Sequence, residues 1–453
     1  MSRGVRDVAE QQVVTVVGGG LAGSECALQL AQRGVRVRLL EQRPQAPAPA
    51  HHTDRLAELV CSNSLKSLRE DSAAGLLKWE LGQMGSHLMR MARACAVPAG
   101  GALAVDRDRF SAMVTQAVES CPNIELVREE VCEIPEGPCV IAAGPLCSER
   151  LFSSLCALVG AQHLSFFDAA APIVDAETID RTIAFSQSRY EEGIGDYLNC
   201  PMDREEYDAF WDQLVAAKRV VSRDFEETDL FNACQPVEEV ARKGHDTLRF
   251  GALKPVGISD PRTGRRPWAV VQLRPENAEL TAYNLVGFQT NLTWGEQARV
   301  FRMIPGLGNA EFFRYGVMHR NSFVDAPRVL DASFAVSGTQ VRLAGQITGT
   351  EGYVEAIASG LLAAVNTYAD LIGHDRLELP RTTAFGALVA YATNPDTQPY
   401  QPMHVNFGLV PPLEGRRMRK GERYAAYAAR AKDDLAACLA RRGDLFGSDA
   451  RRA

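Results

Sequence analysis

Thiols are the side chains of this sequence with the clearest capacity for covalent chemistry. The chain has 11 cysteines among 453 residues, and none of them forms a C-x-x-C pair or stands near His at zinc-finger spacing. Most of these thiols are therefore expected to be small buried groups. Cys61, in ELVCSNSLKS, is followed by Ser62-Asn63-Ser64, which are turn and N-cap formers. If Ser62 or Asn63 caps a helix, the helix N-terminus would favour a thiolate at Cys61.

A second group of residues has the spacing of a dinucleotide-binding loop. GGGLAG matches the G-x-G-x-x-G pattern and lies between a β-branched run and a helical segment. Such glycines allow a tight turn and let backbone N–H groups approach a pyrophosphate at a helix N-terminus. An acidic residue at the end of the next strand is placed to bind a ribose. The predicted cofactor-binding residues here are Gly18, Gly19, Gly20, Leu21, Ala22, Gly23 and Glu41.

The elements that position these residues are visible as apolar patterns. Residues 13–17 and 35–40 are predicted to be strands with a helix at 24–33 between them, which makes a βαβ unit. Further helices are predicted at 76–92, 107–119 and 354–368, and further strands at 124–131, 140–143, 268–273, 283–288 and 341–344.

Two later segments favour FAD over NAD as the bound dinucleotide. VIAAGP at 140–145 resembles the strand and glycine that cross beneath FAD in two-motif flavoproteins. VRLAGQITGTEGY at 341–353 resembles their late strand, loop and helix, which meet the flavin. No second G-x-G-x-x-G is present for a separate nicotinamide domain. These segments add Gly144, Gly345, Gly352 and Tyr353 to the predicted cofactor-binding residues.

The order of these segments predicts an α/β fold with a Rossmann-like FAD-binding domain of the two-motif flavoprotein type. Residues 1–150 would form its first part and residues 331–453 its second part, with a basic C-terminal helix. Residues 151–330 hold three of the four tryptophans and many Pro and Gly turns. They are predicted to form an inserted α+β domain for the substrate.

The composition, with 46% apolar and 23% charged residues, is that of a soluble globular protein. No run of 18 apolar residues predicts a membrane helix and the N-terminus lacks a secretory signal, so a cytoplasmic location is expected. The net charge of −7 argues against general coating of nucleic acid. Residues 414–453 nevertheless carry 11 Lys/Arg and 6 Asp/Glu, which indicates either a solvated helix or a patch for a polyanion.

Specific segments extend over nearly the whole chain, from about residue 14 to about residue 427. They include GGGLAGSE, PAHHTDRLAELVCSNSLKS, VPAGGALAVDRDRF, NLVGFQTNL, RYGVMHRNSF, AGQITGTEGYVEA and MHVNFGL. In these segments the chain resembles the bacterial folate- and FAD-dependent tRNA (uracil-5-)-methyltransferases. AGQITGTEGY is shared loosely with related flavoproteins that modify wobble uridine, which are longer and carry an added C-terminal helical domain.

The resemblance implies transfer of a methylene group from 5,10-methylenetetrahydrofolate to C5 of uridine 54 in the tRNA T-loop. In the family, reduced FAD carries the methylene on N5 and supplies the hydride, and NAD(P)H reduces the flavin again. C5 of uracil is a poor nucleophile until a thiolate adds at C6, so this chemistry requires an exposed, partly ionised cysteine and a base for the C5 proton. The uracil is expected to be extruded from the T-loop for the reaction.

The resemblance separates two cysteines from the other nine. Cys234, in FNACQPVEEVARKG, aligns with the uracil nucleophile of the family, and Cys61 aligns with its second active-site cysteine, the proton acceptor. It also implies that a basic run beside two tyrosines meets tRNA phosphates. That run comprises Arg416, Arg417, Arg419, Lys420 and Arg423, beside Tyr424 and Tyr427.

Weaker candidates follow from position alone, and no spacing indicates a metal site. The positions of His51 and His52 suit a contact with FAD or folate, and those of Glu351 and Glu355 suit a contact with ribose or pterin. For each pair, an ordinary solvated or structural role is the alternative.

Three other functions compete with folate-dependent tRNA methylation. An NAD(P)H-dependent flavoprotein thiol oxidoreductase would be expected to carry a C-x-x-C near the flavin, and the sequence has none. A nonenzymatic RNA- or folate-binding protein would tolerate loss of the glycines or of both thiols, and all are kept. The same chemistry on ribosomal RNA stays open at this point, because RNA choice resides in surface shape. The sequence does not distinguish NADH from NADPH and does not give the oligomeric state.

Overall fold

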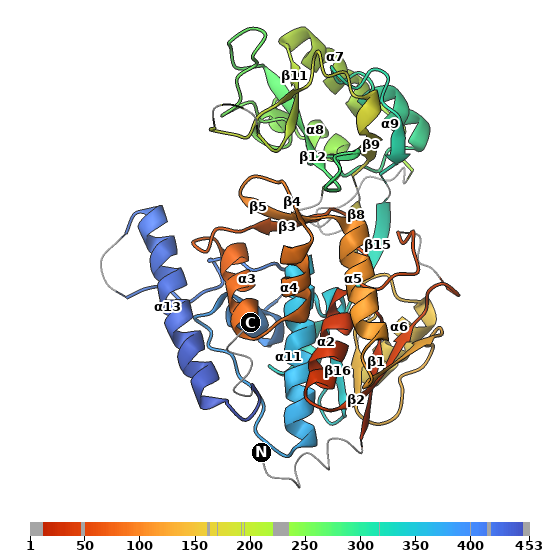
Figure 1. The fold of residues 1–453 in the computed structure, drawn as a ribbon, viewed down its shortest axis with the longest axis vertical. Helices are drawn as coiled ribbons and strands as arrows, with labels where there is room; N and C mark the ends of the chain where they lie inside the picture. The colour runs from red at the N-terminus through yellow and green to blue at the C-terminus, as the bar shows by residue number, and fades with distance from the viewer. Residues whose placement is uncertain are drawn as a thin grey trace.

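Two bodies make up the protein, one from both ends of the chain and one from its middle (Figure 1). The structure is a computed structural model that describes residues 12–46, 50–160, 164–169, 171–191, 193, 195–220, 235–316, 318–398, 400–414 and 418–446; of 164–169 and 318–320 it describes the backbone. An antiparallel ribbon of β8 (Leu164–Ala169) and β15 (Met318–Phe323) lies between the two bodies.

A five-stranded parallel sheet forms the centre of the first body. The strands at 139–141 and 341–343 are fully buried and the strand at 13–17 is mostly buried, as is common in parallel sheets, whereas the strands at 36–41 and 124–128 also carry exposed residues. The order is that of a nucleotide-binding α/β domain, and the predicted fold class is confirmed. In sheet order the strands are β16 (Val341–Leu343), β7 (Cys139–Ile141), β1 (Val13–Val17), β2 (Arg36–Glu41) and β6 (Ile124–Arg128).

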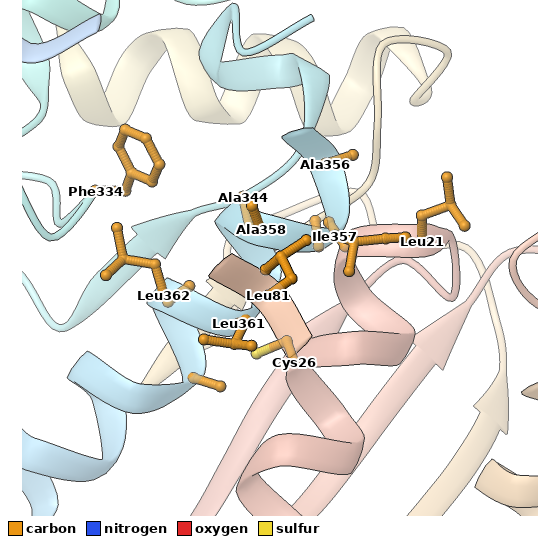
Figure 2. Packing of buried hydrophobic residues seen from close by; sticks show 14 of the residues in the cluster. Leu21, Cys26, Leu81, Phe334, Ala344, Ala356, Ile357, Ala358, Leu361 and Leu362 are labelled. Carbon is orange, nitrogen blue, oxygen red and sulfur yellow. The ribbon is translucent and has the colours of Figure 1, made fainter. Parts of the chain in front are cut away.

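The packing of α2 (Leu21–Gln32) against α11 (Tyr353–Leu371) joins the two ends of the chain. Figure 2 shows Ile357 and Leu361 of α11 beside Leu21 and Cys26 of α2. Residues more than 300 positions apart therefore share one hydrophobic core.

The remaining elements of the first body surround this centre. Its helices are α3 (Ala73–Gln83), α4 (His87–Ala94), α5 (Arg107–Glu119), α6 (Glu149–Val159), α10 (Ala326–Val329), α12 (Ala384–Thr393) and α13 (Lys420–Arg441), with the 3-10 turn η5 (Gln346–Thr348). A small antiparallel sheet has the order β3 (Ser64–Ser67), β5 (Ala102–Val105) and β4 (Ala96–Val97).

The second body is an antiparallel sheet with helices, as expected for an inserted α+β unit. Its own hydrophobic cluster extends from Ala171 to Ala310. In sheet order the strands are β10 (Phe185–Ser186), β11 (Leu198–Met202), β12 (Ala269–Pro275), β13 (Ala282–Leu285), β9 (Ile173–Asp175) and β14 (Phe312–Arg314). The helices are α7 (Arg204–Ala216), α8 (Val237–Arg242) and α9 (Trp294–Phe301), with 3-10 turns η1 (Ala176–Thr178) and η4 (Thr247–Phe250).

The two hydrophobic clusters indicate where the inserted unit begins and ends. Leu151, Phe152 and Leu155 of α6 pack in the core of the first body, as do Phe323 and Leu330. All five lie inside the span 151–330 that the sequence assigned to the insertion. We propose that the inserted unit comprises about residues 171–314, with the β8–β15 ribbon as its stem.

Several element boundaries differ from the sequence prediction. The helix expected at 76–92 is two helices, because Gly85 adopts a φ of 73° and the Ser86 side chain caps α4 by accepting a hydrogen bond from Met89 N–H. Helix α2 begins at Leu21 instead of residue 24, directly after the glycine turn. Strand β2 includes Glu41 as its last residue.

Candidate functional site

A cavity of about 340 Å³ lies at the carboxyl ends of the parallel strands, where ligands bind in folds of this class. Its walls come from the ends of β1, β2, β7 and β16, the start of α11 and the loop before β3. The following predicted site residues line it: Gly18, Gly20, Leu21, Ala22, Glu41, Cys61, Gly144, Gly345, Gly352 and Tyr353.

Gly19 and Gly23 are not among the residues that line the cavity, but they fix the shape of the glycine turn. Gly19 N–H donates to Glu41 Oε2 at 2.7 Å. A Cβ at Gly23 would lie 1.8 Å from the carbonyl oxygen of Gly18, so this close crossing requires glycine. A Cβ at Gly20 would meet nothing within 4 Å, and no side chain caps the N-terminus of α2 there. The turn is thus tight on its inner side and open on the side where an anion would bind.

Glu41 is a buried carboxylate held by its neighbours. Its Oε1 accepts hydrogen bonds from Arg43 Nε at 2.8 Å and from Arg43 N–H at 3.0 Å. Burial alone would raise the pKa of Glu41, but the bonds from Arg43 and Gly19 outweigh it, so the pKa lies below its usual range. Glu41 is therefore ionised at neutral pH. Arg43 was missed from the sequence, because nothing in QRP marks it as buried.

Three buried polar atoms that line or face the cavity have no hydrogen-bond partner in the part of the chain that the structure describes. They are His51 Nδ1, Asn321 Oδ1 and Glu355 Oε2, and all three residues are among those lining the cavity. Buried polar atoms in native proteins nearly always have a partner. A dinucleotide with its ribose hydroxyls and ring nitrogens fits such a lining, so the residues present suit the predicted FAD.

Of the weaker histidine and glutamate candidates, His51, Glu351 and Glu355 line the cavity and His52 is exposed. Burial, reinforced by the charge of Arg43, lowers the pKa of His51 to about 4, so its imidazole is neutral near pH 7. His52 is exposed and its backbone N–H donates to Glu58. Glu351 lines the cavity and accepts a hydrogen bond from Gln346 Nε2.

Tyr353 holds the loop that carries Cys61. Its hydroxyl oxygen accepts hydrogen bonds from Cys61 N–H at 2.8 Å and from Ser62 N–H at 3.1 Å. Cys61 is half-buried and faces the cavity. The expectation that Ser62 or Asn63 caps a helix is wrong, because strand β3 follows and the next helix, α3, begins at Ala73.

Arginine side chains, not a helix N-terminus, supply the positive charge near Cys61. Arg107 Nη2 donates to the Cys61 carbonyl oxygen at 3.1 Å. Arg314 Nη2 donates to the Val60 carbonyl oxygen at 2.6 Å. Arg274 Nη2 donates to Ser62 Oγ at 2.8 Å. These arginines lie 40 or more residues from one another in the sequence, which is why sequence patterns did not find them.

Cys139 and Cys200 are buried, whereas Cys61 is half-buried. Burial raises the pKa of Cys139 and of Cys200 to about 12, so both are inert at neutral pH. Neither Cys139 nor Cys200 forms a disulfide bond. Within the described ranges, no group of three His, Cys, Asp or Glu side chains is arranged to hold a metal ion.

Cys234 lies outside the described residues. Val237, three positions later, donates its N–H to the Gln289 carbonyl oxygen at 2.7 Å, and Gln289 lines the cavity. The chain that follows Cys234 is thus anchored at the cavity wall.

The basic run at the C-terminal end is described in part, since Arg416 and Arg417 lie outside the described residues. Lys420 and Arg423 are exposed in the first turn of α13, and their cationic groups lie 5.5 and 5.8 Å from the Tyr424 ring centroid. Tyr427 is buried and stacks on Phe407, so it does not belong to this surface. In the described part of the chain no helix has the length and apolar character needed to cross a membrane.

Comparisons with known proteins agree with this architecture. Residues 13–375 match the family model described as glucose inhibited division protein A. The solved structure of Aquifex aeolicus GidA covers 96% of this chain and 74% of its own, with a TM-score of 0.69 at 16% identity, which shows a shared fold.

Relatives of higher identity span almost the full length. The methylenetetrahydrofolate--tRNA-(uracil-5-)-methyltransferase TrmFO of Moorella thermoacetica is 54% identical over 420 residues, which cover 92% of this chain and 96% of that protein. The protein of the same name from Geobacter sulfurreducens is 56% identical over 425 residues, covering 93% and 98%. The chain therefore belongs to the glucose inhibited division protein A family and, within it, to the methylenetetrahydrofolate--tRNA-(uracil-5-)-methyltransferases.

Proposed function

We propose that this protein methylates C5 of uridine 54 in the T-loop of tRNA, with 5,10-methylenetetrahydrofolate as the carbon source. The observation that carries this proposal is the meeting of the dinucleotide loop and the Cys61 loop in one cavity. Relatives of more than 50% identity that carry the name of this activity support it.

FAD is the cofactor that this cavity would hold. Gly18, Gly20 and the open N-terminus of α2 would bind its pyrophosphate, and Glu41 would accept a ribose hydroxyl. Gly345 and Tyr353 would lie at the flavin end, where the late strand, loop and helix come together. The bound flavin supplies the carrier for the one-carbon unit and the hydride that reduces it, and NAD(P)H would return it to the reduced state.

Two cysteines would divide the chemistry on the uracil. The Cys234 thiolate would form a bond to C6, which places negative charge on C5 and makes that carbon nucleophilic. After C5 has formed its new bond to carbon, the C5 proton would pass to the Cys61 thiolate. Loss of that proton restores the double bond as the bond between Cys234 and C6 breaks, so Cys234 leaves as a thiolate.

A polyanionic substrate explains the basic C-terminal helix. Lys420 and Arg423, with Arg419 before them, would bind tRNA phosphates near the N-terminus of α13. Tyr424 beside them would add an aromatic surface. A protein acting on tRNA in this way would work in the cytoplasm.

Reconstitution tests the proposal directly. Purified protein with FAD, NADPH, methylenetetrahydrofolate and unmodified tRNA should yield 5-methyluridine at position 54, read by mass spectrometry of nuclease fragments. Omission of the folate should abolish the product. Product on ribosomal RNA with none on tRNA would replace the substrate and keep the chemistry. NADPH oxidation without any methylated RNA would favour a flavoprotein oxidoreductase instead.

A further inference from the structure

Four consecutive residues, 59–62, each accept a hydrogen bond from an arginine side chain. The donors are Arg107 at the start of α5, Arg274 in β12 and Arg314 at the end of β14, and we call these three the arginine cage. Cys61 lies inside this run. The first arginine belongs to the FAD-binding body, and the other two belong to the inserted unit.

Hydrogen bonds fix each guanidinium against the Cys61 loop. Arg107 Nη1 donates to the Leu59 carbonyl oxygen at 2.5 Å in addition to its bond with the Cys61 carbonyl. Arg274 Nε donates to Asn63 Oδ1 at 2.8 Å, next to the bond from its Nη2 to Ser62 Oγ. Asn63 is fully buried, and its Nδ2 donates to the Pro275 carbonyl at the end of β12. The inserted unit is therefore docked on this loop.

The cage carries more positive charge than its carboxylates balance. Arg107 pairs with Glu276, with 2.5 Å between Nε and Oε2. Among the described residues, no carboxylate lies within ion-pair distance of Arg274 or Arg314. A buried cation without an anion is costly, and the carbonyl oxygens it serves could be satisfied by neutral donors. The more distant carboxylates Glu276, for Arg274, and Glu58, for Arg314, offset part of this charge, and an anion within the cage would offset more of it.

Cys61 is electrostatically coupled to all three arginines. Burial lowers the pKa of Arg274 and of Arg314. The charge of a Cys61 thiolate opposes that shift in both, after Glu276 and Tyr197 for Arg274 and after Tyr353 for Arg314. For Arg107, burial would also lower the pKa, but Glu276, then Tyr353 and a Cys61 thiolate, raise it. The coupling is mutual, so the guanidiniums favour a thiolate at Cys61. Among the described residues, the other ionisable groups at this loop and its cage are Glu58 and His52 on its own segment, Glu276 beyond β12, Tyr197 before β11 and Tyr353 on α11.

We propose that the arginine cage keeps Cys61 ionised, and that docking of the inserted unit, which brings Arg274 and Arg314, makes this thiol ready to accept a proton. Arg274 is thus a positioning residue that acts through Cys61. The inference rests on the proposed function only for the use made of the thiolate; the ionisation itself is a property of the protein alone.

The pH dependence of Cys61 alkylation tests the cage. The purified holoenzyme is treated with iodoacetamide between pH 5 and 10, and peptide mass spectrometry follows Cys61 separately from the other cysteines. In Arg274→Met the pH of half-maximal alkylation should rise by about one unit or more, the effect of losing one nearby opposite charge. Arg274→Lys, which keeps the charge but not the two-pronged geometry, should restore most of the wild-type profile.

A matched control is Arg189→Met. Arg189 also belongs to the inserted unit and binds β12 through Gln272, but it makes no bond to the Cys61 loop, so the profile should not change. If Arg274→Met does not fold, Arg314→Met makes the same test from another strand. Equal profiles for wild type and Arg274→Met, or an equal shift in the Lys and Met variants, would overturn the inference. Because alkylation needs neither folate nor RNA, absence of methylated tRNA would overturn the proposed function alone.

Discussion

At the scale of single residues, the site depends on groups that hold backbone atoms in place. Tyr353 is the clearest case, because one hydroxyl oxygen serves two consecutive N–H groups of the Cys61 loop. Burial raises the pKa of this phenol, with the Cys61 thiol adding to the shift, so Tyr353 is a neutral hydroxyl at physiological pH. It is an anchor for the loop in addition to a wall of the cavity.

Removing that hydroxyl gives the first prediction. Tyr353→Phe leaves two N–H groups without their acceptor, so the free energy of unfolding should fall by about 1–3 kcal/mol. Methylation should slow, because Cys61 is less well positioned. Denaturant unfolding and single-turnover assays measure the two effects. Tyr391→Phe loses a hydrogen bond to the Gln401 carbonyl oxygen instead of the two from the Cys61 loop and serves as the control; equal losses of activity in both variants would contradict the anchoring role.

The site residues that could be predicted from the sequence are those that belong to recognisable motifs of neighbouring residues. The glycine turn, Glu41 and Cys61 all belong to short contiguous motifs, and the structure brings them to one cavity. Arg107, Arg274 and Arg314 stand alone in three unrelated segments, and only the fold brings them together. The expectation that Ser62 or Asn63 caps a helix failed for a related reason. Serine also occurs outside helix caps: the Ser62 side chain accepts a hydrogen bond from Arg274, and Ser64 begins strand β3.

At the scale of elements, the contact between α2 and α11 joins both ends of the chain into one domain. Gly360 of α11 crosses α2 so closely that a Cβ would lie 2.1 Å from the Ala22 carbonyl oxygen. Gly421, in the first turn of α13, has open space around it. Gly360 and Gly421 are thus two helical glycines, one at a crowded position and one at an open position, and each can be substituted by alanine for comparison.

Substituting them should give opposite results. Gly360→Ala should lower the free energy of unfolding by about 1–3 kcal/mol, since α2 and α11 must move apart. Gly421→Ala should leave stability unchanged or raise it slightly, because alanine favours the helix. Thermal unfolding of both variants measures this. A stable Gly360→Ala protein with full FAD content would show that the crossing tolerates a methyl group.

A buried carboxyl joins α3 to the start of α12. Glu80 Oε1 and Oε2 accept hydrogen bonds from Ala384 N–H and Phe385 N–H at 2.7 and 3.0 Å. Burial nevertheless raises the pKa of Glu80 to about 7. The folded protein therefore holds a proton between pH 4.5 and 7 that the unfolded chain has released. Stability from this group is present at low pH and is lost as pH rises through about 7.

The corresponding prediction compares pH profiles. The free energy of unfolding of wild type relative to Glu80→Gln should fall by about 3 kcal/mol from pH 4.5 to pH 7.5. Urea unfolding at several pH values measures it. Glu70→Gln removes an exposed carboxylate that pairs with Lys432, and its difference from wild type should change far less. A flat difference for Glu80→Gln would mean that Glu80 is ionised in the fold throughout.

Element boundaries show where local patterns stop being informative. The apolar spacing of residues 76–92 continues across two helices, and only the left-handed Gly85 and the cap at Ser86 divide them. In contrast, the strand of residues 13–17 and the helix of residues 107–119 were predicted with their observed bounds, since each has strong signals at both ends.

At the scale of the whole molecule, the inserted unit and the C-terminal helix flank the FAD-binding body on different sides (Figure 1). If tRNA binds along α13, the double substitution Lys420→Ala/Arg423→Ala should weaken binding and reduce the slope of log affinity against log salt by about one to two. Arg36→Ala/Arg38→Ala removes two exposed arginines from β2 and should leave the slope unchanged. Filter binding at several salt concentrations distinguishes them; equal slopes for the two double variants would exclude α13 as the phosphate contact.

The most direct test of the account follows a single carbon atom. The protein is incubated with FAD, NADPH, unmodified tRNA and methylenetetrahydrofolate whose methylene carbon is ¹³C, and the T-loop fragment is analysed by mass spectrometry. The account predicts one ¹³C methyl group at C5 of uridine 54, and none when Cys234→Ala replaces the wild-type protein. A methyl group without ¹³C, a label at another position, or normal labelling by Cys234→Ala would contradict it.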